Sequence, residues 1–152
     1  AEELRARGLP VDRPHMTDLS DSLREKNGYD YVIRTLTEWA RETGGDAVIE
    51  SIRNPGEVEY IKAQPDAHLI AVDADPHLRY ERILARAGEF DKITYDRFLK
   101  DEDREMANTD PWRQNIAYCV GQAEYIYQNN GTLTELHEWL DGVITELRYG
   151  KE

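Results

Sequence analysis

Short runs of hydrophobic residues alternate along this chain with segments in which hydrophobic residues recur every three to four positions. The runs predict buried strands at residues 46–51, 68–73 and 123–127, and the helical spacing predicts amphipathic helices between them, such as residues 29–42. Strands that are hydrophobic on both faces are typical of a parallel sheet covered on both sides. The order predicts a single α/β domain over residues 1–152, a three-layer parallel sheet with helices on both faces.

Capping and turn residues place the ends of the helices. Asp75 followed by Pro76 is typical of a helix start, and Thr132 follows the turn Asn129-Asn130-Gly131 and can cap the last helix. The remaining helices are expected to end near residue 7 and to span residues 17–26, 56–63, 76–87, 94–107, 110–121 and 132–147. Three strands are few for a stable open sheet, so part of the sheet is expected to be missing.

Charge and cysteine content limit which partners and which cellular compartment we expect for this chain. The chain carries 31 acidic and 19 basic residues, a formal net charge of -12, which disfavours nucleic acid and anionic membranes as partners. It has no hydrophobic stretch near the roughly 20 residues needed to span a bilayer, and no secretory signal. The single cysteine, Cys119, fits a buried structural thiol in a reducing compartment. We therefore expect a cytoplasmic protein whose partner is a small molecule.

Polar residues follow the first predicted strand, where parallel α/β sheets bind ligands. Glu50 ends that strand and could hold a metal ion or its bound water, and Arg53 could fork onto a phosphate. The alternative is structural, with Glu50 capping a neighbouring helix and Arg53 paired with Glu57 or Glu59. Both interpretations stay open on the pattern alone.

Three arginines share one face of the helix that follows the second strand. Arg79, Arg82 and Arg86 stand at positions i, i+3 and i+7, over roughly 10 Å of helix. Three rigid guanidinium forks suit a polyphosphate, whose transfer depends on positioning and charge neutralisation. A solvated face paired with Asp and Glu is the equally simple alternative.

Two further segments offer candidate ligands. Residues 88–107 are rich in charge and could form a helical lid over a substrate, with Arg97 and Arg104 as ligands, or an ordinary exposed helical excursion. The turn Asn129-Asn130-Gly131 presents amide and backbone groups beside the third strand, although Asn-Gly most often only marks a turn. The four histidines and Cys119 show no metal-ligand spacing.

Three segments, in this order, resemble P-loop nucleotide kinases. They are E-S-I-R-N-P-G-E-V-E-Y-I-K at 50–62, H-L-I-A-V-D-A-D-P-H-L-R-Y-E-R-I-L-A-R at 68–86 and R-Q-N-I-A-Y-C-V-G-Q-A-E-Y-I-Y-Q-N-N-G-T-L-T-E-L at 113–136. The first two resemble adenylate-kinase-related and dephospho-CoA-kinase-like ATPases, and phage deoxynucleoside monophosphate kinases carry a comparable run. The third resembles the kinase-like domains fused to deoxycytidylate deaminases. The likeness extends over residues 1–147.

The resemblance implies a role for each candidate residue. Glu50 stands where an acidic residue beside the Mg-ATP site is expected, and Ser51 where that family often has glycine. Arg53 is similar to the arginine that contacts the acceptor phosphate. The arginines that resemble those neutralising the transferring phosphates are Arg79, Arg82 and Arg86, with Arg104 as a lid partner. The loop that resembles the adenine-lining loop is Asn129, Asn130 and Gly131. Mg²⁺ would arrive with ATP.

The chain departs from the family's pattern in one large respect. These kinases begin with a strand and the loop G-x-x-x-x-G-K-[ST], whose amides, lysine and hydroxyl hold the phosphates and magnesium. That motif is absent from the 152 residues. Either an N-terminal segment of roughly 30 to 40 residues belongs to the natural protein, or the fold has been rebuilt as a regulatory or binding module. Exposed strand edges could also be covered by a second copy of the chain.

The sequence therefore predicts ATP-dependent phosphoryl transfer to a nucleotide, a (deoxy)nucleoside monophosphate or another small phosphorylated acceptor, provided that the P-loop exists. A non-catalytic nucleotide-binding or interaction module is the alternative.

Overall fold

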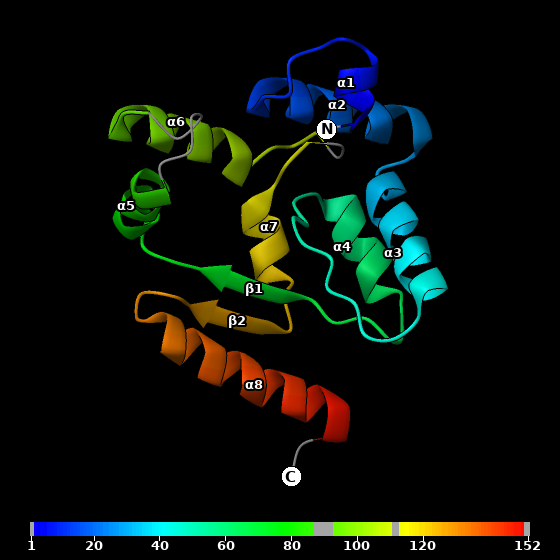
Figure 1. The fold of residues 1–152 in the computed structure, drawn as a ribbon, viewed down its shortest axis with the longest axis vertical. Coiled ribbons are helices and arrows are strands. Elements are labelled where there is room, and N and C mark those ends of the chain that lie inside the picture. Colours follow the sequence, from blue (N-terminus) through cyan, green and yellow to red (C-terminus); the bar gives the residue numbers. More distant parts are fainter. Residues whose placement is uncertain (1, 87–92, 111–112, 151–152) are drawn as a thin grey trace.

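The computed structural model describes residues 2–86, 93–110 and 113–150. Residues 87–92, which include the start of the predicted lid-like segment, and residues 111–112 of the predicted helix 110–121 lie outside the described residues. The helices are α1 (Glu2–Ala6), α2 (Arg13–Asn27), α3 (Tyr31–Thr43), α4 (Pro55–Lys62), α5 (Pro76–Arg86), α6 (Tyr95–Met106), α7 (Ile116–Gly121) and α8 (Leu133–Tyr149), and the strands are β1 (Ile70–Asp73) and β2 (Tyr125–Gln128). The chain is a mixed α/β protein in which helices predominate (Figure 1).

The two strands form a parallel pair, in agreement with the predicted strand direction. Ile70 pairs with Tyr125 and Val72 with Tyr127, so these four side chains share one face of the pair. Helix α8 covers the β2 side of that face, where the Tyr127 ring stacks on Trp139 with centroids 5.0 Å apart and the Tyr125 hydroxyl donates to Glu146 over 2.8 Å. Val72 on β1 stays 48% exposed. Helix α8 therefore covers β2 and leaves the neighbouring side chain of β1 partly exposed.

The first predicted strand, residues 46–51, is not a strand in this structure. Residues 46–53 have no regular secondary structure, and the sheet of the described residues consists of β1 and β2. Val48, a residue expected to be buried, is 97% exposed, whereas Ile49 and Ile52 pack against the core. The hydrophobic run was wrongly assigned because a run of this composition becomes a strand only when another strand supplies its hydrogen bonds.

The core lies on the helical side of the molecule. Its buried cluster joins α3, α4, α7 and the residue before β1 and consists of Ile33, Val58, Ile61, Leu69 and Cys119. A buried ion pair fixes α2 to the start of α4, because Arg24 Nη2 and Nε donate to Glu57 Oε1 over 2.7 and 3.0 Å. Burial raises the pKa of the Cys119 thiol to about 12, aided by the nearby Glu57 carboxylate. The expectation that Cys119 is buried is confirmed.

Helix starts follow local capping groups. Thr132 and Glu135 form a reciprocal capping box at α8, and Asp75 accepts from the backbone N–H of His77 at α5, both as predicted. Helix α2 begins earlier than predicted, because Asp12 accepts from His15 N and Pro14 stands in the first turn. Helix α7 begins at Ile116, after the cap Asn115, and not near residue 110.

The contact between α4 and the segment before α3 leaves no room for a side chain at residue 56. Gly56 is required by a close approach, since a Cβ there would lie 2.5 Å from Tyr29 Cβ. Among the described residues, every helix is too short or too polar to cross a bilayer.

Candidate functional site

The carboxyl ends of β1 and β2 are joined by hydrogen bonds between the two loops that leave them. Asn129 N donates to the Asp73 carbonyl over 2.7 Å, and Asp75 N donates to Asn130 Oδ1 over 2.8 Å. The two strands of the pair therefore present their following loops as one connected surface. This is the edge at which parallel α/β sheets bind ligands.

Arg82 of α5 reaches across to the second of these loops. Its Nη1 donates to the Asn129 carbonyl over 2.8 Å and its Nη2 to the Gly131 carbonyl over 3.2 Å. The side chain remains exposed. The structure thus brings together Arg82 and the loop 129–131, two features that the sequence singled out separately. The Asn130 amide oxygen, which was expected to face a nucleotide, instead accepts the hydrogen bond from Asp75 N that joins the two loops.

Arg79 is bound within the protein on three sides. Its Nε and Nη2 form a two-pronged pair with Glu102 of α6 over 2.9 and 2.6 Å, and Nη1 donates to Asp73 over 2.5 Å and to the Ala74 carbonyl. Burial opposes the charge, but pairing with Glu102 and Asp73 outweighs it and raises the pKa of Arg79. The carboxylate-paired alternative for this face therefore describes Arg79, whose guanidinium ties the end of β1 and α5 to α6.

The aromatic contact between α5 and α6 adds to this attachment. The Tyr80 ring packs against both Tyr95 and Phe98, with centroids 5.1 and 5.6 Å away, and those two rings stack on each other. The Tyr80 hydroxyl donates to the Ile93 carbonyl. The described part of the predicted lid, α6, is thus packed against α5. Arg97 on its outer surface pairs with Asp101. Arg86, the third arginine of the stripe, is exposed and has an interaction of its own.

Glu50 and Arg53 lie on either side of a backbone kink. Ser51 between them has φ of 70°, in the left-handed region that favours glycine, which costs of order 1 kcal/mol or more for another residue. Glu50 is exposed and Arg53 half-buried. No described residue forms a hydrogen bond or ion pair with the Arg53 guanidinium. Its backbone is fixed, because Arg53 N donates to Glu57 Oε2 and its carbonyl accepts from Asn115 N over 2.8 Å.

A polar cleft of about 170 Å³ opens between α2, the end of α6 and the linker before α7. The side chains that give it its chemistry are Asp18, Asp21, Arg104, Glu105, Arg113 and Gln114. Arg104, predicted as a substrate ligand, is therefore in this cleft and not beside Arg79 or Arg82. The linker that carries Gln114 is bound to the Arg53 segment, since Asn54 Nδ2 also donates to the Arg113 carbonyl over 3.2 Å.

Sequence reasoning missed Gln114 and the partner of Arg79. Gln114 is 8% exposed, and its Oε1 is a buried oxygen that has no hydrogen-bond partner among the residues that the structure describes. A lone Gln before a short helix gave no signal. The acidic run Asp101-Glu102-Asp103 did carry a signal for Arg79, because a carboxylate face close in sequence was available to pair with the arginine stripe.

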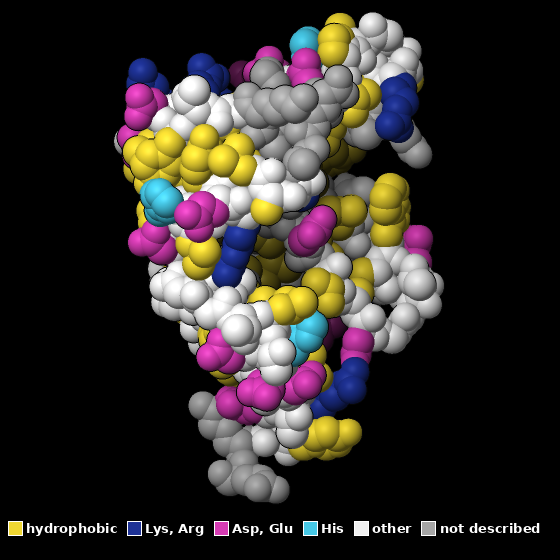
Figure 2. Space-filling model, turned by 60° about the vertical axis from the view of Figure 1, so that its left-hand side comes forward, with side chains coloured by type: hydrophobic (Ala, Val, Ile, Leu, Met, Phe, Trp, Pro, Cys, Tyr) yellow, Lys and Arg dark blue, Asp and Glu magenta, His cyan; other side chains and the backbone are white. Residues whose placement is uncertain are grey.

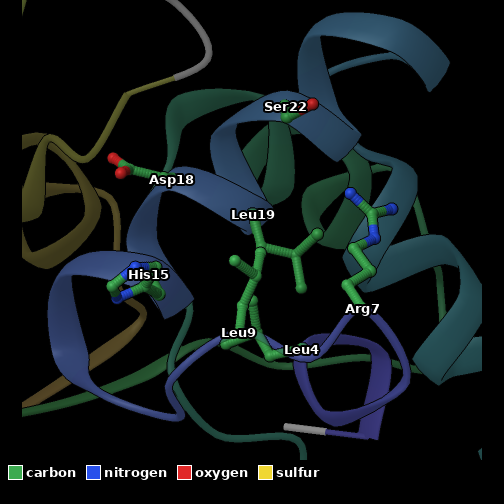
Figure 3. A pocket seen from close by; sticks show the side chains of 7 residues that line it. All are labelled: Leu4, Arg7, Leu9, His15, Asp18, Leu19 and Ser22. Atoms are coloured by element: carbon green, nitrogen blue, oxygen red, sulfur yellow. The ribbon is translucent and has the colours of Figure 1, made fainter.

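A second hollow of about 230 Å³ lies between α1 and α2. Figure 3 shows Leu4, Leu9 and Leu19 meeting at its centre, with Arg7 and His15 at opposite sides. The His15 ring contacts Asp12, which caps α2. This hollow has an apolar floor and no converging polar groups, so its geometry is that of a packing gap between two helices.

The surface charge has no broad basic field on the face shown in Figure 2, where basic side chains are scattered among acidic and hydrophobic ones. Within the described ranges, His, Cys, Asp and Glu form no group of three or more that could hold a metal ion.

These features define a mixed α/β protein with a parallel strand pair and a separate polar cleft. At the carboxyl ends of the strands, Arg82 of α5 is hydrogen-bonded to the loop that follows β2. The chain is similar to archaeal proteins named "UPF0200 protein". It is 27% identical to one from Staphylothermus marinus over 132 residues, 87% of this chain and 67% of that protein. It is 24% identical to one from Methanocaldococcus jannaschii over 148 residues, 95% of this chain and 72% of that protein.

A third relative, from Methanococcus vannielii, is 29% identical over 148 residues, 95% of this chain and 77% of that protein. These relatives are longer than the part that aligns with this chain. Their printed names state no substrate or reaction. No model of a known protein family matches the chain, and no solved structure matches it.

Proposed function

We propose that the chain belongs to an ATP-dependent phosphotransferase that acts on a nucleotide, a (deoxy)nucleoside monophosphate or another small phosphorylated acceptor. An acceptor oxygen would attack the γ-phosphorus of ATP, the bond from that phosphorus to the bridging oxygen would break, and ADP would leave. Catalysis of such a transfer consists mainly of positioning and charge neutralisation. Arginines fixed at a sheet edge suit that task.

The observation that carries the proposal is the contact between Arg82 and the loop 129–131. This contact puts a guanidinium at the carboxyl ends of two parallel strands, and it fixes the position of the loop that follows β2. Only part of the guanidinium's five N–H groups is used by the two carbonyl groups. The remaining donors face no described carboxylate, so Arg82 is available to a phosphate in a way that Arg79 is not.

The acceptor would be held by Arg53. Its guanidinium has no hydrogen-bond or ion-pair partner among the described residues, while its backbone is fixed on both sides. The left-handed Ser51 immediately before it supports a functional role, since backbone strain of this kind is concentrated at ligand sites. Glu50 would lie beside the Mg-ATP.

A complete three-layer sheet with a P-loop is part of the proposal. It requires one more strand, placed between residues 46–50 and β1 and followed by the phosphate-cradling loop that these 152 residues lack. Val48, exposed at 97%, and the half-exposed Val72 are hydrophobic side chains that such a strand would help to cover. The lid role of residues 88–107 and a cytoplasmic location are part of the same proposal.

The test is phosphoryl transfer by the protein as its gene encodes it. ADP release is measured with ATP, Mg²⁺ and each common nucleoside monophosphate or dephospho-CoA in turn. Arg53→Ala and Arg82→Ala are each expected to lower kcat/KM by about 100-fold or more, as for other electrostatic stabilisers. Arg41→Ala is the matched control, because Arg41 of α3 is exposed and its guanidinium pairs with Asp66 and Gln64, which are not part of the proposed site. An unchanged rate in Arg82→Ala would remove its role.

The second candidate is a non-catalytic nucleotide-binding module, in which the exposed Arg82 and the half-buried Arg53 hold a nucleotide without phosphoryl transfer. Calorimetric titration separates the two. Binding of a nucleotide without ADP release would support the module, and ADP release that depends on Arg82 would support the phosphotransferase. A melting temperature unmoved by ATP, nucleoside monophosphates and dephospho-CoA would exclude both.

A further inference from the structure

The cleft between α2 and the α6–α7 linker contains a polar atom whose burial is unexplained by the protein itself. Gln114 lines the cleft and is more than nine-tenths buried, and its Oε1 accepts no hydrogen bond from any described group. An unsatisfied buried carbonyl oxygen costs about 1–3 kcal/mol. A ligand that donates an N–H to this oxygen would remove that cost.

The charges around the cleft are arranged on two sides. Asp18 and Asp21 of α2 supply carboxylates, and Arg104 and Arg113 supply guanidinium groups from α6 and the linker. Arg113 pairs with Asp110 over 3.2 Å, whereas no described group accepts from the Arg104 guanidinium. Burial raises the pKa of Asp21, against the attraction of Arg24 and Arg113. The cleft thus offers several acceptors beside one uncommitted donor group.

Its size limits the part of a ligand that can enter. A cavity of about 150 Å³ accommodates benzene, so about 170 Å³ suits one planar ring system. Pockets that hold whole drug-sized ligands are larger, about 300–1,000 Å³. The cleft therefore fits one end of a nucleotide and not the whole molecule.

We propose that this cleft binds a nucleobase that carries an exocyclic amino group. The amino group has two N–H donors, one for Gln114 Oε1 and one for a carboxylate of Asp18 or Asp21, while Arg104 donates to the neighbouring ring nitrogen or carbonyl. Uracil and thymine would present a carbonyl to the carboxylates at the same position, and that arrangement is repulsive. This inference rests on the proposed function for its orientation, because the linker carrying Gln114 is hydrogen-bonded to Arg53, the proposed phosphate ligand.

The test uses free nucleosides, so that it does not depend on phosphate binding or turnover. Cytidine and uridine form one matched pair and adenosine and inosine another, since each pair differs by an amino group replaced with a carbonyl. Calorimetric titration of the gene's full product is expected to show at least about 10-fold tighter binding of the amino-bearing member in one pair or both, and each good base-edge contact is worth a factor of this size. Equal binding within both pairs would overturn the proposal.

Gln114→Met provides the decisive variant. It removes the unsatisfied oxygen, so the ligand-free protein is expected to melt at the same or a higher temperature, while the discrimination within the nucleoside pair is lost. Gln122→Met is the control, because Gln122 accepts from Lys62 over 2.6 Å outside the cleft, and it should keep the discrimination. A lower melting temperature in Gln114→Met would show that the Gln114 amide stabilises the ligand-free protein, and the proposal would fail.

The outcomes also separate this inference from the phosphotransferase. Discrimination between cytidine and uridine without any ADP release would support the cleft and remove the proposed reaction. ADP release by a protein that binds both members of each pair equally would support the reaction and overturn the cleft.

Discussion

The two valines Val48 and Val58 illustrate the difference between the two halves of this molecule. Val58 on α4 is 0% exposed within a cluster of four segments, whereas Val48, ten residues earlier, is 97% exposed. In the sequence, Val48 stands in a hydrophobic run, whereas Val58 is flanked by Glu57 and Glu59. The helical half, with α2, α3, α4 and α7, packs around a core (Figure 1). The sheet of the described residues is one strand pair, and α8 covers the β2 side of one of its faces.

The difference shows what each kind of element needs. A helix satisfies its backbone hydrogen bonds internally, so α3 and α4 require only a hydrophobic partner to pack against. A strand needs a neighbouring strand for its backbone as well. Helices α3 and α4 therefore bury their hydrophobic residues against described neighbours, whereas Val72 of β1 stays half-exposed.

The largest effect is expected at the buried ion pair of the helical half. Glu57→Ala removes the buried carboxylate that pairs with the buried Arg24 guanidinium and leaves only the longer contact of 3.4 Å to Asp21, so it is expected to lower the free energy of unfolding by about 3–5 kcal/mol in urea titrations. Arg24→Met combined with Glu57→Ala should recover a large part of this loss, because the uncompensated charge is gone. Glu59→Ala, on the exposed side of the same helix, is the control. A double variant no more stable than Glu57→Ala would show that the pair's charge is not what matters.

A smaller effect is expected from the two valines themselves. Val58→Ala removes two buried methyl groups and should cost about 2 kcal/mol, whereas Val48→Ala in this 152-residue chain should change the stability by less than about 0.5 kcal/mol. The same pair of variants in the gene's full product tests the proposed extra strand. If a strand covers Val48 there, the two costs become similar. If Val48→Ala is still silent, the three-layer sheet is absent.

The sequence predicted the helices and the strand pair well, because their signals are local. Thr132 and Asp75 cap helices as expected, and β1 and β2 lie within two residues of their predicted starts. Residues 46–51 failed because pairing is not encoded in the run itself. The wrong start of α7 has a different cause, since the cap is Asn115 and an Asp-Pro pair five residues earlier gave a stronger but misleading signal.

The candidate site was predictable only in part. The spacing of Arg79, Arg82 and Arg86 correctly gave one helix, but it could not reveal that Arg79 turns to Glu102 while Arg82 turns to Gly131. Those choices depend on which segments pack beside α5. The approach of the linker 113–115 to Arg53 is likewise a tertiary contact between residues about 60 positions apart. Helical periodicity identifies a face, and the packing of neighbouring elements decides what each residue on it binds.

The most narrowly defined prediction, whose effect appears only at alkaline pH, concerns Cys119 in the packed half. Its thiol has a pKa of about 12 in the folded protein, against 9.0 as the ordinary value, because burial and Glu57 disfavour the thiolate. As the pH rises above about 9, the unfolded chain releases this proton while the folded chain keeps it. The free energy of unfolding should therefore decrease between about pH 9 and 12, and this contribution is fully present below pH 9. Cys119→Ala should lose that part of the decrease, which is measured as the difference between the two denaturant midpoints at each pH. If the denaturant midpoints of wild type and Cys119→Ala run parallel from pH 8 to 11, the core does not raise the pKa of the thiol. The titration of Cys119 would then give no evidence that the helical half is more tightly packed than the strand pair.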